Sequence, residues 1–258
     1  NQNSTKIKLV KDFFSVYISV MEEIYMKHIV GLSGGKDSTA LALRLAEIEP
    51  RDYEYICNET GNELPEMHAH WEKLETMLGK KIIRVRHDKD LEGTIRDMNM
   101  LPSVFARWCT RVLKIEPTIE YMNALPEGST LYVGLRADEE ARRGLFGEDI
   151  KIRFPMREWG WNESDVWDYL AQRGVEIPKR TDCALCPYQR LGEWRDLHAN
   201  YPVLWARGVA LEKELGHTFR SPGRDTWPAD LESLGKEFDN GRKLREYKRN
   251  TTCRVCSL

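Results

Sequence analysis

The stretch that decides the fold runs from His28 to Ile48 and reads HIVGLSGGKDSTALALRLAEI. It begins with a short apolar run, continues through a loop with two adjacent glycines, and ends in residues of high helix propensity. This order predicts a strand, a loop and a helix in direct succession. Because the loop joins the carboxyl end of the strand to the amino end of the helix, backbone N–H groups and the positive end of the helix dipole would face one point.

The loop within this stretch has the composition of a phosphate-binding site. Its two glycines allow close approach to the backbone, Lys36 supplies a cation, and two serines supply hydroxyl donors. Asp37 would orient the loop or hold Mg²⁺. A plain strand-to-helix turn also favours glycine and serine, but all six residues together after an apolar strand favour phosphate binding. The predicted phosphate-binding residues are Ser33, Gly34, Gly35, Lys36, Asp37 and Ser38.

The alternation of apolar strands and helices continues after the loop. Residues 53–57 and 81–85 read as strands, residues 65–78 as a helix between them, and residues 131–135 as a further strand. Such alternation predicts an α/β fold, a doubly wound parallel sheet with helices on both faces. Ligands of this fold class bind at the carboxyl ends of the strands, where the glycine loop is predicted to lie.

The composition of the sequence changes near residue 155, and the chain is predicted to have three regions. Residues 1–26 have apolar and aromatic residues at helical spacing and predict an N-terminal amphipathic helix. Residues 27–154 form the predicted nucleotide-binding α/β domain. Residues 155–258 are rich in tryptophan and arginine, are interrupted by prolines, and predict a helical C-terminal subdomain that bears cysteines. Within it, Asn162 predicts a helix cap, with Glu163 and Asp165 in the first turn of that helix.

Bulk composition is that of a soluble globular protein. The chain has 258 residues, 41% hydrophobic and 31% charged, and no apolar run approaches the roughly 18 residues of a membrane span. The first helix does not resemble a signal peptide, so we expect no membrane association and a cytoplasmic location. A formal net charge of −2 offers no bulk attraction to a polyanion, so nucleic acid is neither excluded nor indicated.

Four of the six cysteines form two C-x-x-C pairs, Cys183/Cys186 and Cys253/Cys256. Without an export signal, such pairs favour metal ligation or redox chemistry over structural disulfides. The four thiolates would satisfy tetrahedral Zn²⁺ and pin the basic tail, residues 241–258, to the subdomain. Zinc is therefore one interpretation of these residues.

The spacing of the loop differs from that of the P-loop NTPases, G-x-x-x-x-G-K-[ST], because Lys36 directly follows the glycine pair. It resembles instead the S-G-G-x-D-S loop of the PP-loop ATP pyrophosphatases, which have an adenine nucleotide α-hydrolase-like fold. Those enzymes split ATP between the α and β phosphates and adenylate a substrate. The resemblance implies that residues 33–38 hold the leaving pyrophosphate, with Lys36 and Asp37 as catalytic residues and with ATP and Mg²⁺ as cofactors.

Further stretches between residues 27 and 190 resemble the phosphoadenylyl sulfate (PAPS) reductase-like group, which includes DNA phosphorothioation sulfurtransferases. Residues 58–66, NETGNELPE, resemble the D-T-G-x-x-x-P-E segment, and residues 107–117, RWCTRVLKIEP, resemble R-x-C-[CT]-x-x-x-K-x-x-P. Residues 134–143, GLRADEEARR, resemble G-x-R-x-x-E-S-x-x-R, with Glu140 in place of the serine. The run from residue 155 to 169 resembles the P-x-x-x-W-x-x-x-D-V-W stretch that precedes a C-x-x-C pair.

The resemblance assigns residues in these segments. Thr60, Gly61 and Arg143 are implied to bind the nucleotide, and Lys114 and Arg136 to act as catalytic cations that neutralise phosphate charge. Each cation taken singly is equally consistent with a solvated surface charge.

The same resemblance offers a second interpretation of the cysteines, a 4Fe-4S cluster. Relatives of this kind place a cluster on the cysteine of the R-x-C segment and on a later C-x-x-C pair. Cys109, Cys183 and Cys186 would then be ligands, with Cys253 or Cys256 as the fourth. We favour the cluster over zinc because Cys109 falls on the family position, although ligand type alone separates the two poorly.

Two departures bear on the activity. Reductases with the cluster have a Cys-Cys pair where this chain has Cys109-Thr110, and they use a cysteine in an E-C-G-x-H segment where this chain has NTTCRVC at residues 250–256. Reductases also generally lack the Gly-Gly-Lys-Asp core of the loop. We therefore expect an ATP-dependent adenylating enzyme, an ATP pyrophosphatase that activates an acceptor for sulfur transfer.

Two alternatives remain open. One is a reductase of adenylyl sulfate or its 3′-phosphate, with Cys253 or Cys256 as nucleophile. The other is a non-catalytic nucleotide-binding subunit with a zinc staple. The acceptor, a nucleic acid or a small molecule, the sulfur-donor protein and assembly as a homo-oligomer are left open by the sequence.

Overall fold

A parallel sheet forms the centre of the computed structural model, which describes residues 26–142, 146–147 and 149–244. The sheet has five strands in the order β3-β2-β1-β4-β5, and every neighbouring pair is parallel. This arrangement confirms the predicted α/β fold class. The strands are β1 (His28–Gly31), β2 (Tyr53–Asn58), β3 (Ile82–Val85), β4 (Thr130–Tyr132) and β5 (Lys151–Arg153).

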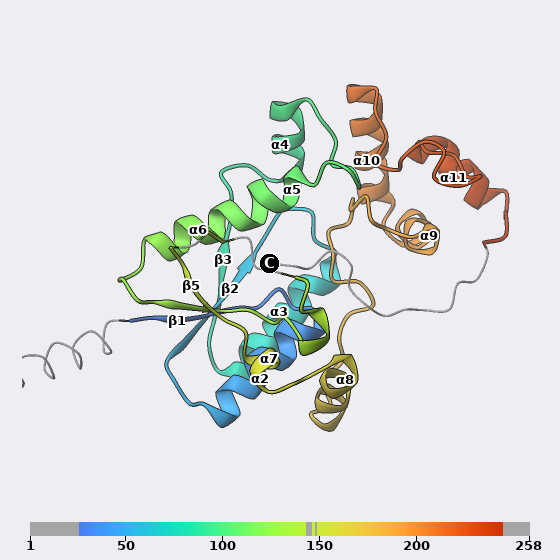
Figure 1. Cartoon of the computed structure of the whole chain (residues 1–258). Coiled ribbons are helices and arrows are strands. Elements are labelled where there is room, and N and C mark those ends of the chain that lie inside the picture. The colour runs from blue at the N-terminus through green and yellow to red at the C-terminus, as the bar shows by residue number, and fades with distance from the viewer. Residues whose placement is uncertain (1–25, 143–145, 148, 245–258) are drawn as a thin grey trace, which may run out of the picture.

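Helices cover both faces of the sheet, as Figure 1 shows, with α2 and α3 on one side and α5 and α6 on the other. Parallel strands buried on both faces need apolar residues at successive positions. Accordingly Val30 and Tyr132 belong to the core beneath α2 and α3, and Ile29 and Leu131 belong to the core on the opposite face. The helices are α2 (Lys36–Ile48), α3 (Pro65–Leu78), α4 (Leu91–Met98), α5 (Trp108–Thr110), a π-helical turn η1 (Arg111–Ile115), α6 (Glu116–Asn123), a 3-10 turn η2 (Ala137–Glu139), α7 (Pro155–Glu158) and α8 (Glu163–Gln172).

The strand order reverses between β1 and β4. In doubly wound sheets this reversal opens a crevice outside the carboxyl ends of the two strands. The loop after β1 and the segment after β4 meet there, because a Cβ on Gly134 would lie 3.2 Å from the Asp37 carbonyl carbon and from the Ser38 nitrogen. Glycine at residue 134 therefore allows the two backbones to approach.

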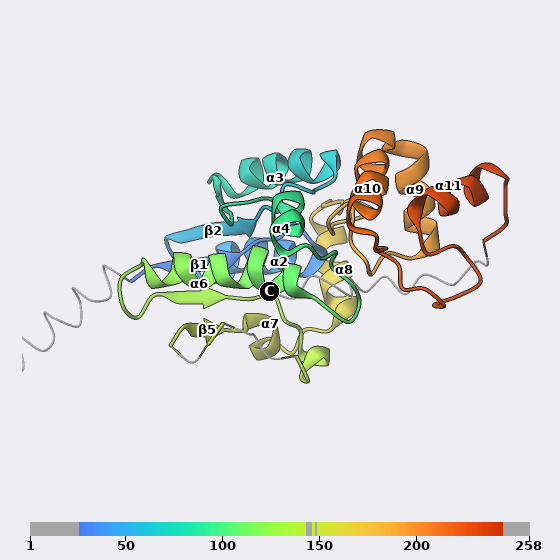
Figure 2. The same cartoon turned by 90° about the horizontal axis from the view of Figure 1, so that it is seen from above.

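The C-terminal region has two parts that pack differently. Helix α8 rests on α2 and contributes Val166, Tyr169 and Leu170 to the core beneath the sheet. The helices α9 (Leu191–Asn200), α10 (Pro202–Leu215) and α11 (Leu231–Asp239) gather beside the sheet in both views of Figures 1 and 2. Trp194 and Trp205 lie in their core, which continues into α4 and α5.

The local predictions agree with the structure in one case and differ from it in two. Asn162 caps α8 as expected, because its side chain accepts hydrogen bonds from the Ser164 and Asp165 nitrogens. The strand predicted at residues 131–135 is shorter and spans Thr130–Tyr132. Strand β5 escaped prediction because Lys-Ile-Arg has a single apolar residue, as a short edge strand allows.

Parts of the predicted organisation lie outside the described residues. These are the N-terminal helix up to residue 25, Arg143, and the basic tail from residue 245 onward, with Cys253 and Cys256. Among the described helices, none is long and apolar enough to span a membrane.

Candidate functional site

The six-residue loop follows β1 and enters α2 at the strand-order reversal. Its two serines bond each other, with Ser33 Oγ 3.0 Å from Ser38 Oγ, and Ser38 Oγ donates to the Gly35 carbonyl at 3.1 Å. Gly34 has φ +88°, a left-handed conformation that favours glycine. The loop is therefore closed on itself, and its last three residues, Lys36, Asp37 and Ser38, form the first turn of α2.

Lys36 is folded back onto its neighbour. Its Nζ donates to Asp37 Oδ1 at 2.9 Å and to Oδ2 at 2.8 Å, and it lies 3.6 Å from Glu163 Oε1. The lysine is only 5% exposed, so its charge is desolvated and depends on these carboxylates.

Arg136 holds the other side of Asp37. Its Nη1 donates to Asp37 Oδ1 at 3.0 Å and its Nε donates to Asp138 Oδ1 at 2.8 Å. Burial alone would lower the pKa of Arg136, but the bond to Asp138 and the charges of Asp37 and Glu139 raise it above its ordinary value. The bond to Arg136 in turn lowers the pKa of Asp138. The contact between Arg136 and Asp138 thus favours the charged form of both side chains.

The sequence prediction missed two carboxylates at this site. The sequence predicts Glu163 in the first turn of a helix, and the structure confirms that position. The structure also brings Glu163 within ion-pair distance of Lys36. Asp138 stands in the predicted Arg136 segment but received no role. The only sequence signal for Asp138 was its place two residues after Arg136 in the same motif. No sequence signal pointed to Glu163.

The loop after β2 carries the predicted Thr60 and Gly61. Glu63 organises it, because its Oε1 accepts from the Thr60 nitrogen at 2.8 Å and from Thr60 Oγ1 at 2.6 Å. Gly61 has φ +71°, and a Cβ there would lie 2.7 Å from Asp90 Cβ. These contacts fix the loop, with Thr60 buried, at the same edge of the sheet as the glycine loop.

The C-x-x-C segment crosses between the two loops. Thr60 Oγ1 lies 3.3 Å from Cys183 Sγ, and the Ala184 nitrogen donates to the Asn62 carbonyl at 2.6 Å. At the other end, Thr181 Oγ1 lies 3.6 Å from the position of a Cβ on Gly35. The segment from Thr181 to Ala184 therefore joins the glycine loop to the loop after β2.

Cys109, Cys183 and Cys186 share one electrostatic neighbourhood. Burial raises the pKa of each thiol, and the charge of Lys114 lowers all three pKa values in part. The charge of Cys109 raises the pKa of Cys183, and that of Cys183 raises the pKa of Cys186. Lys114 therefore lies with the cysteines, whereas Lys36, Asp37 and Arg136 form a separate group.

The fit of these residues to a cluster is partial. Three thiols in a common neighbourhood are the donor type that iron–sulfur clusters and zinc require. Among the residues that the structure describes, however, no three His, Cys, Asp or Glu side chains are grouped as metal ligands. Cys253 and Cys256, the predicted further ligands, lie outside the described residues.

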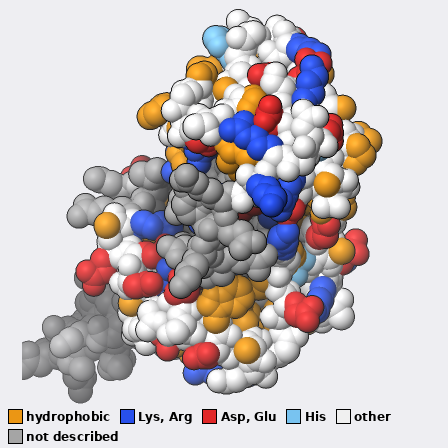
Figure 3. Space-filling view, turned by 90° about the vertical axis from the view of Figure 1, so that its right-hand side faces the viewer, with side chains coloured by type: hydrophobic (Ala, Val, Ile, Leu, Met, Phe, Trp, Pro, Cys, Tyr) orange, Lys and Arg blue, Asp and Glu red, His pale blue; other side chains and the backbone are white. Residues whose placement is uncertain are grey.

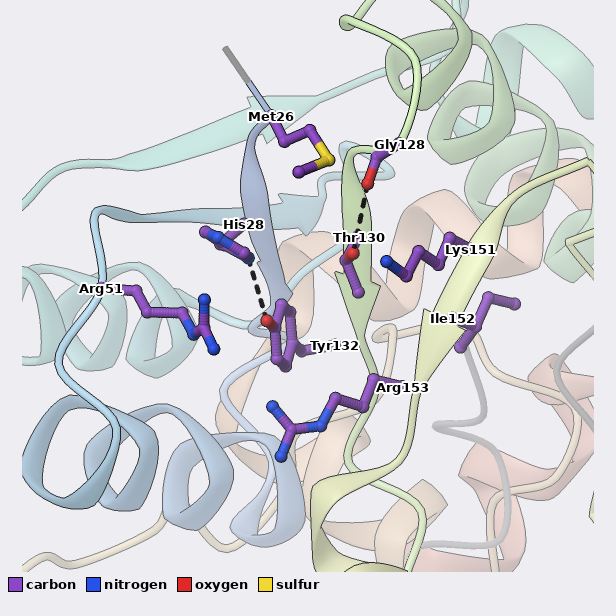
Figure 4. A pocket seen from close by; sticks show the side chains of 9 residues that line it. All are labelled: Met26, His28, Arg51, Gly128, Thr130, Tyr132, Lys151, Ile152 and Arg153. Atoms are coloured by element: carbon purple, nitrogen blue, oxygen red, sulfur yellow. Dashed lines mark hydrogen bonds between the residues drawn. The ribbon is translucent and has the colours of Figure 1, made fainter. Parts of the chain in front are cut away.

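A separate cavity of about 300 Å³ lies at the opposite edge of the sheet, at the amino ends of β1, β4 and β5 (Figure 4). His28 Nδ1 and Tyr132 OH are 2.9 Å apart in its wall. Arg51 and Arg153 both pair with Glu49, so much of their charge is already offset. The cavity is unrelated to the predicted site residues. It is lined by Met26, His28, Arg51, Gly128, Thr130, Tyr132, Lys151, Ile152 and Arg153.

The surface of the helical region carries mixed charge. Figure 3 shows lysine and arginine side chains interspersed with acidic ones on the described part of this face. Two cations there are paired, Lys213 with Glu232 at 2.9 Å and Arg242 with Glu237 at 3.0 Å. This distribution favours no particular polyanionic partner.

The protein is a doubly wound α/β protein with a glycine loop at the reversal of its strand order. The chain matches the family model of the phosphoadenosine phosphosulfate reductase domain over residues 27–199. It belongs to that family, as its motifs predicted.

Two curated relatives come from Methanocaldococcus jannaschii. The uncharacterized protein MJ0066 is 26% identical over 200 residues, 72% of this chain and 41% of that protein. The uncharacterized protein MJ0973 is 26% identical over 234 residues, 82% of this chain and 55% of that protein. The chain thus spans about half the length of these relatives.

Two solved structures are similar at a TM-score of 0.44. The phosphoadenylyl-sulfate reductase of Candida auris, in a phosphate complex, is 12% identical, and the match covers 60% of this chain and 75% of that one. The U34-tRNA thiolase NcsA of Methanococcus maripaludis, with its [4Fe-4S] cluster, is 19% identical, and the match covers 87% of this chain and 84% of that one. Similarity at this level says nothing about shared chemistry.

Proposed function

We propose that this protein is an ATP pyrophosphatase that adenylates an acceptor and prepares it for sulfur transfer. One observation carries the proposal. The complete loop of residues 33–38 lies at the reversal of strand order, with Lys36 and Arg136 converging on Asp37. Such a loop combines backbone N–H groups, a helix amino end and two cations where a triphosphate would bind.

In the first step, an oxygen of the acceptor attacks the α phosphorus of ATP in line with the bond to the β phosphate. The oxygen–phosphorus bond forms as the α–β bridge breaks, which gives an acceptor–AMP ester and pyrophosphate, and the proton of a hydroxyl acceptor passes to water. Loop amides and the charges of Lys36 and Arg136 would stabilise the leaving pyrophosphate. One or two carboxylates suffice to hold Mg²⁺ on a triphosphate, and Asp37 and Asp138, which both bond to Arg136, are the candidates.

In the second step, a sulfur nucleophile of the hydrosulfide or persulfide class displaces AMP from the activated acceptor. The carbon–sulfur or phosphorus–sulfur bond forms as the bond to the AMP oxygen breaks. The Cys183 segment supports this step, because it connects the glycine loop to the β2 loop and brings a thiol to Thr60.

Cys109, Cys183 and Cys186 would hold a 4Fe-4S cluster, with Lys114 partly offsetting its thiolate charge. A bound cluster would supply iron that can bind sulfur. Zinc on the cysteines remains the alternative. The acceptor, a nucleic acid or a small molecule, and the sulfur-donor protein are not specified by these residues.

An anaerobic calorimetric titration with ATP–Mg²⁺, adenylyl sulfate and its 3′-phosphate tests the nucleotide preference. We expect ATP–Mg²⁺ to bind most tightly and to release pyrophosphate when candidate acceptors are added. The double variant Lys36→Ala/Asp37→Ala should lose nucleotide binding, whereas Lys80→Ala, a lysine paired with Asp52 at the far edge of the sheet, should not.

Preference for the sulfonucleotides with thiol-dependent sulfite release would replace this proposal with the reductase alternative. Nucleotide binding without either product would favour the non-catalytic subunit. Unchanged binding in the double variant would reject the loop as the nucleotide site.

A further inference from the structure

A side chain of α3 holds the backbone of the glycine loop. Trp71 Nε1 donates to the Ser33 carbonyl at 3.0 Å. Ser33 is the first residue of the loop, so this bond fixes the peptide that joins Ser33 to Gly34.

The Trp71 side chain is fixed in place. It is 2% exposed, so it cannot swing away without opening the core. The loop therefore packs against a rigid N–H donor.

Contact between α3 and the loop is also close enough to require glycine. A Cβ on Gly34 would lie 2.8 Å from Met67 Cε and 2.9 Å from Trp71 Nε1. Glycine is therefore required at residue 34 both by the left-handed φ and by the close approach of α3.

The bond between Trp71 and the Ser33 carbonyl determines where the Gly34 amide points. In a trans peptide the C=O and the N–H point in opposite directions. With the Ser33 carbonyl turned toward Trp71, the Gly34 N–H points to the opposite side. It has no partner among the described residues, and the next amide, that of Gly35, has only a 3.4 Å contact with Ser33 Oγ. Free backbone amides of this kind are the donors of anion-binding loops.

We propose that Trp71 is a positioning residue that directs the Gly34 amide at the phosphates of the nucleotide. The inference rests on the proposed function for the identity of the anion, and it adds a residue outside the loop motif. It requires no turnover, so it is tested by anion binding.

The test is a titration of the full chain with Mg²⁺–pyrophosphate and with ATP–Mg²⁺, monitored by calorimetry and by the ¹H–¹⁵N signal of Gly34. Trp71→Phe keeps an aromatic ring but removes the donor, and we expect binding to weaken on the order of tenfold, with a smaller shift of the amide signal. Trp194→Phe is the matched control, because Trp194 is fully buried and its Nε1 has no partner. It should bind like the wild type.

Equal affinity of Trp71→Phe and the wild type, or equal losses in Trp71→Phe and Trp194→Phe, would overturn the inference. So would a wild-type protein whose Gly34 signal does not respond to pyrophosphate. A wild type that binds pyrophosphate but never releases it from ATP would reject the proposed function alone.

Discussion

Lys36 Nζ lies 2.8 Å from Oδ2 of Asp37, the next residue in the chain, so the cation and the anion of the loop neutralise each other without a ligand. Arg136, in the segment after β4, also pairs with Asp37. A triphosphate would have to draw Lys36 away from Asp37, and Mg²⁺ would then take its place on the carboxylate. This exchange links the loop charges to nucleotide binding.

We predict that Lys36→Met lowers the rate of pyrophosphate release by two to three orders of magnitude, roughly the effect of removing one charge-stabilising group. Folding should survive, because Arg136 still pairs with Asp37. Steady-state pyrophosphate assays of Lys36→Met and of Lys80→Met measure the effect. Similar rates in both variants would contradict it.

We predict that Arg136→Gln destabilises the protein by about 3–5 kcal/mol, because it removes one partner of a buried ion pair. Arg136 is 3% exposed and contacts both Asp37 and Asp138. Arg51→Gln, which breaks a more exposed pair with Glu49, should cost about 1 kcal/mol or less. Urea unfolding of the two variants gives the comparison, and equal costs would show that burial of Arg136 is unimportant.

Gly34→Ala should abolish nucleotide binding, whereas Gly79→Ala should leave it intact. Both glycines have positive φ, but a Cβ on Gly79 meets nothing within 4 Å, while one on Gly34 would collide with Met67 and Trp71. The backbone strain of about 1 kcal/mol is common to both variants, so their difference isolates the collision. Calorimetric titration with ATP–Mg²⁺ is the measurement. Retained binding by Gly34→Ala would show that α3 tolerates the extra methyl group.

Protein stability should depend on pH through Glu212, a carboxyl in α10. Burial raises the pKa of Glu212 to about 7, although the Phe219 and Leu231 nitrogens donate to it. The folded state therefore binds this proton more tightly than the unfolded chain does. Its contribution is fully present below the ordinary pKa of 4.5 and is lost as pH rises through about 7.

The unfolding free energy should accordingly fall by about 3 kcal/mol more in the wild type than in Glu212→Gln between these pH values. Glu214→Gln, an exposed carboxyl on the same helix, is the control and should follow the wild type. Parallel pH profiles of the wild type and Glu212→Gln would contradict the prediction.

Iron binding tests the cysteines. After anaerobic reconstitution with iron and sulfide, Cys109→Ser and Cys183→Ser should lose the iron content and visible absorption that we expect of the wild type. Cys57→Ser is the control, because Cys57 lies in the core of β2. Retention of zinc rather than iron by the wild type would favour the alternative metal.

The sequence by itself determined the local features of this protein. The run from His28 to Ile48 predicted strand, loop and helix because short-range periodicity and glycine content act over neighbouring residues. Asn162 predicted a helix cap for the same reason. The motifs at residues 58–66, 107–117 and 134–143 also predicted the family, and with it the fold class.

Tertiary structure alone decided which distant residues meet. Arg136 reaches Asp37 across 99 positions of sequence because β4 pairs with β1, and no local pattern specifies that pairing. Glu163 reaches Lys36 because α8 packs on α2. Trp71 reads as an ordinary helix residue, since the direction of a peptide plane in a loop depends on the side chains that pack against it.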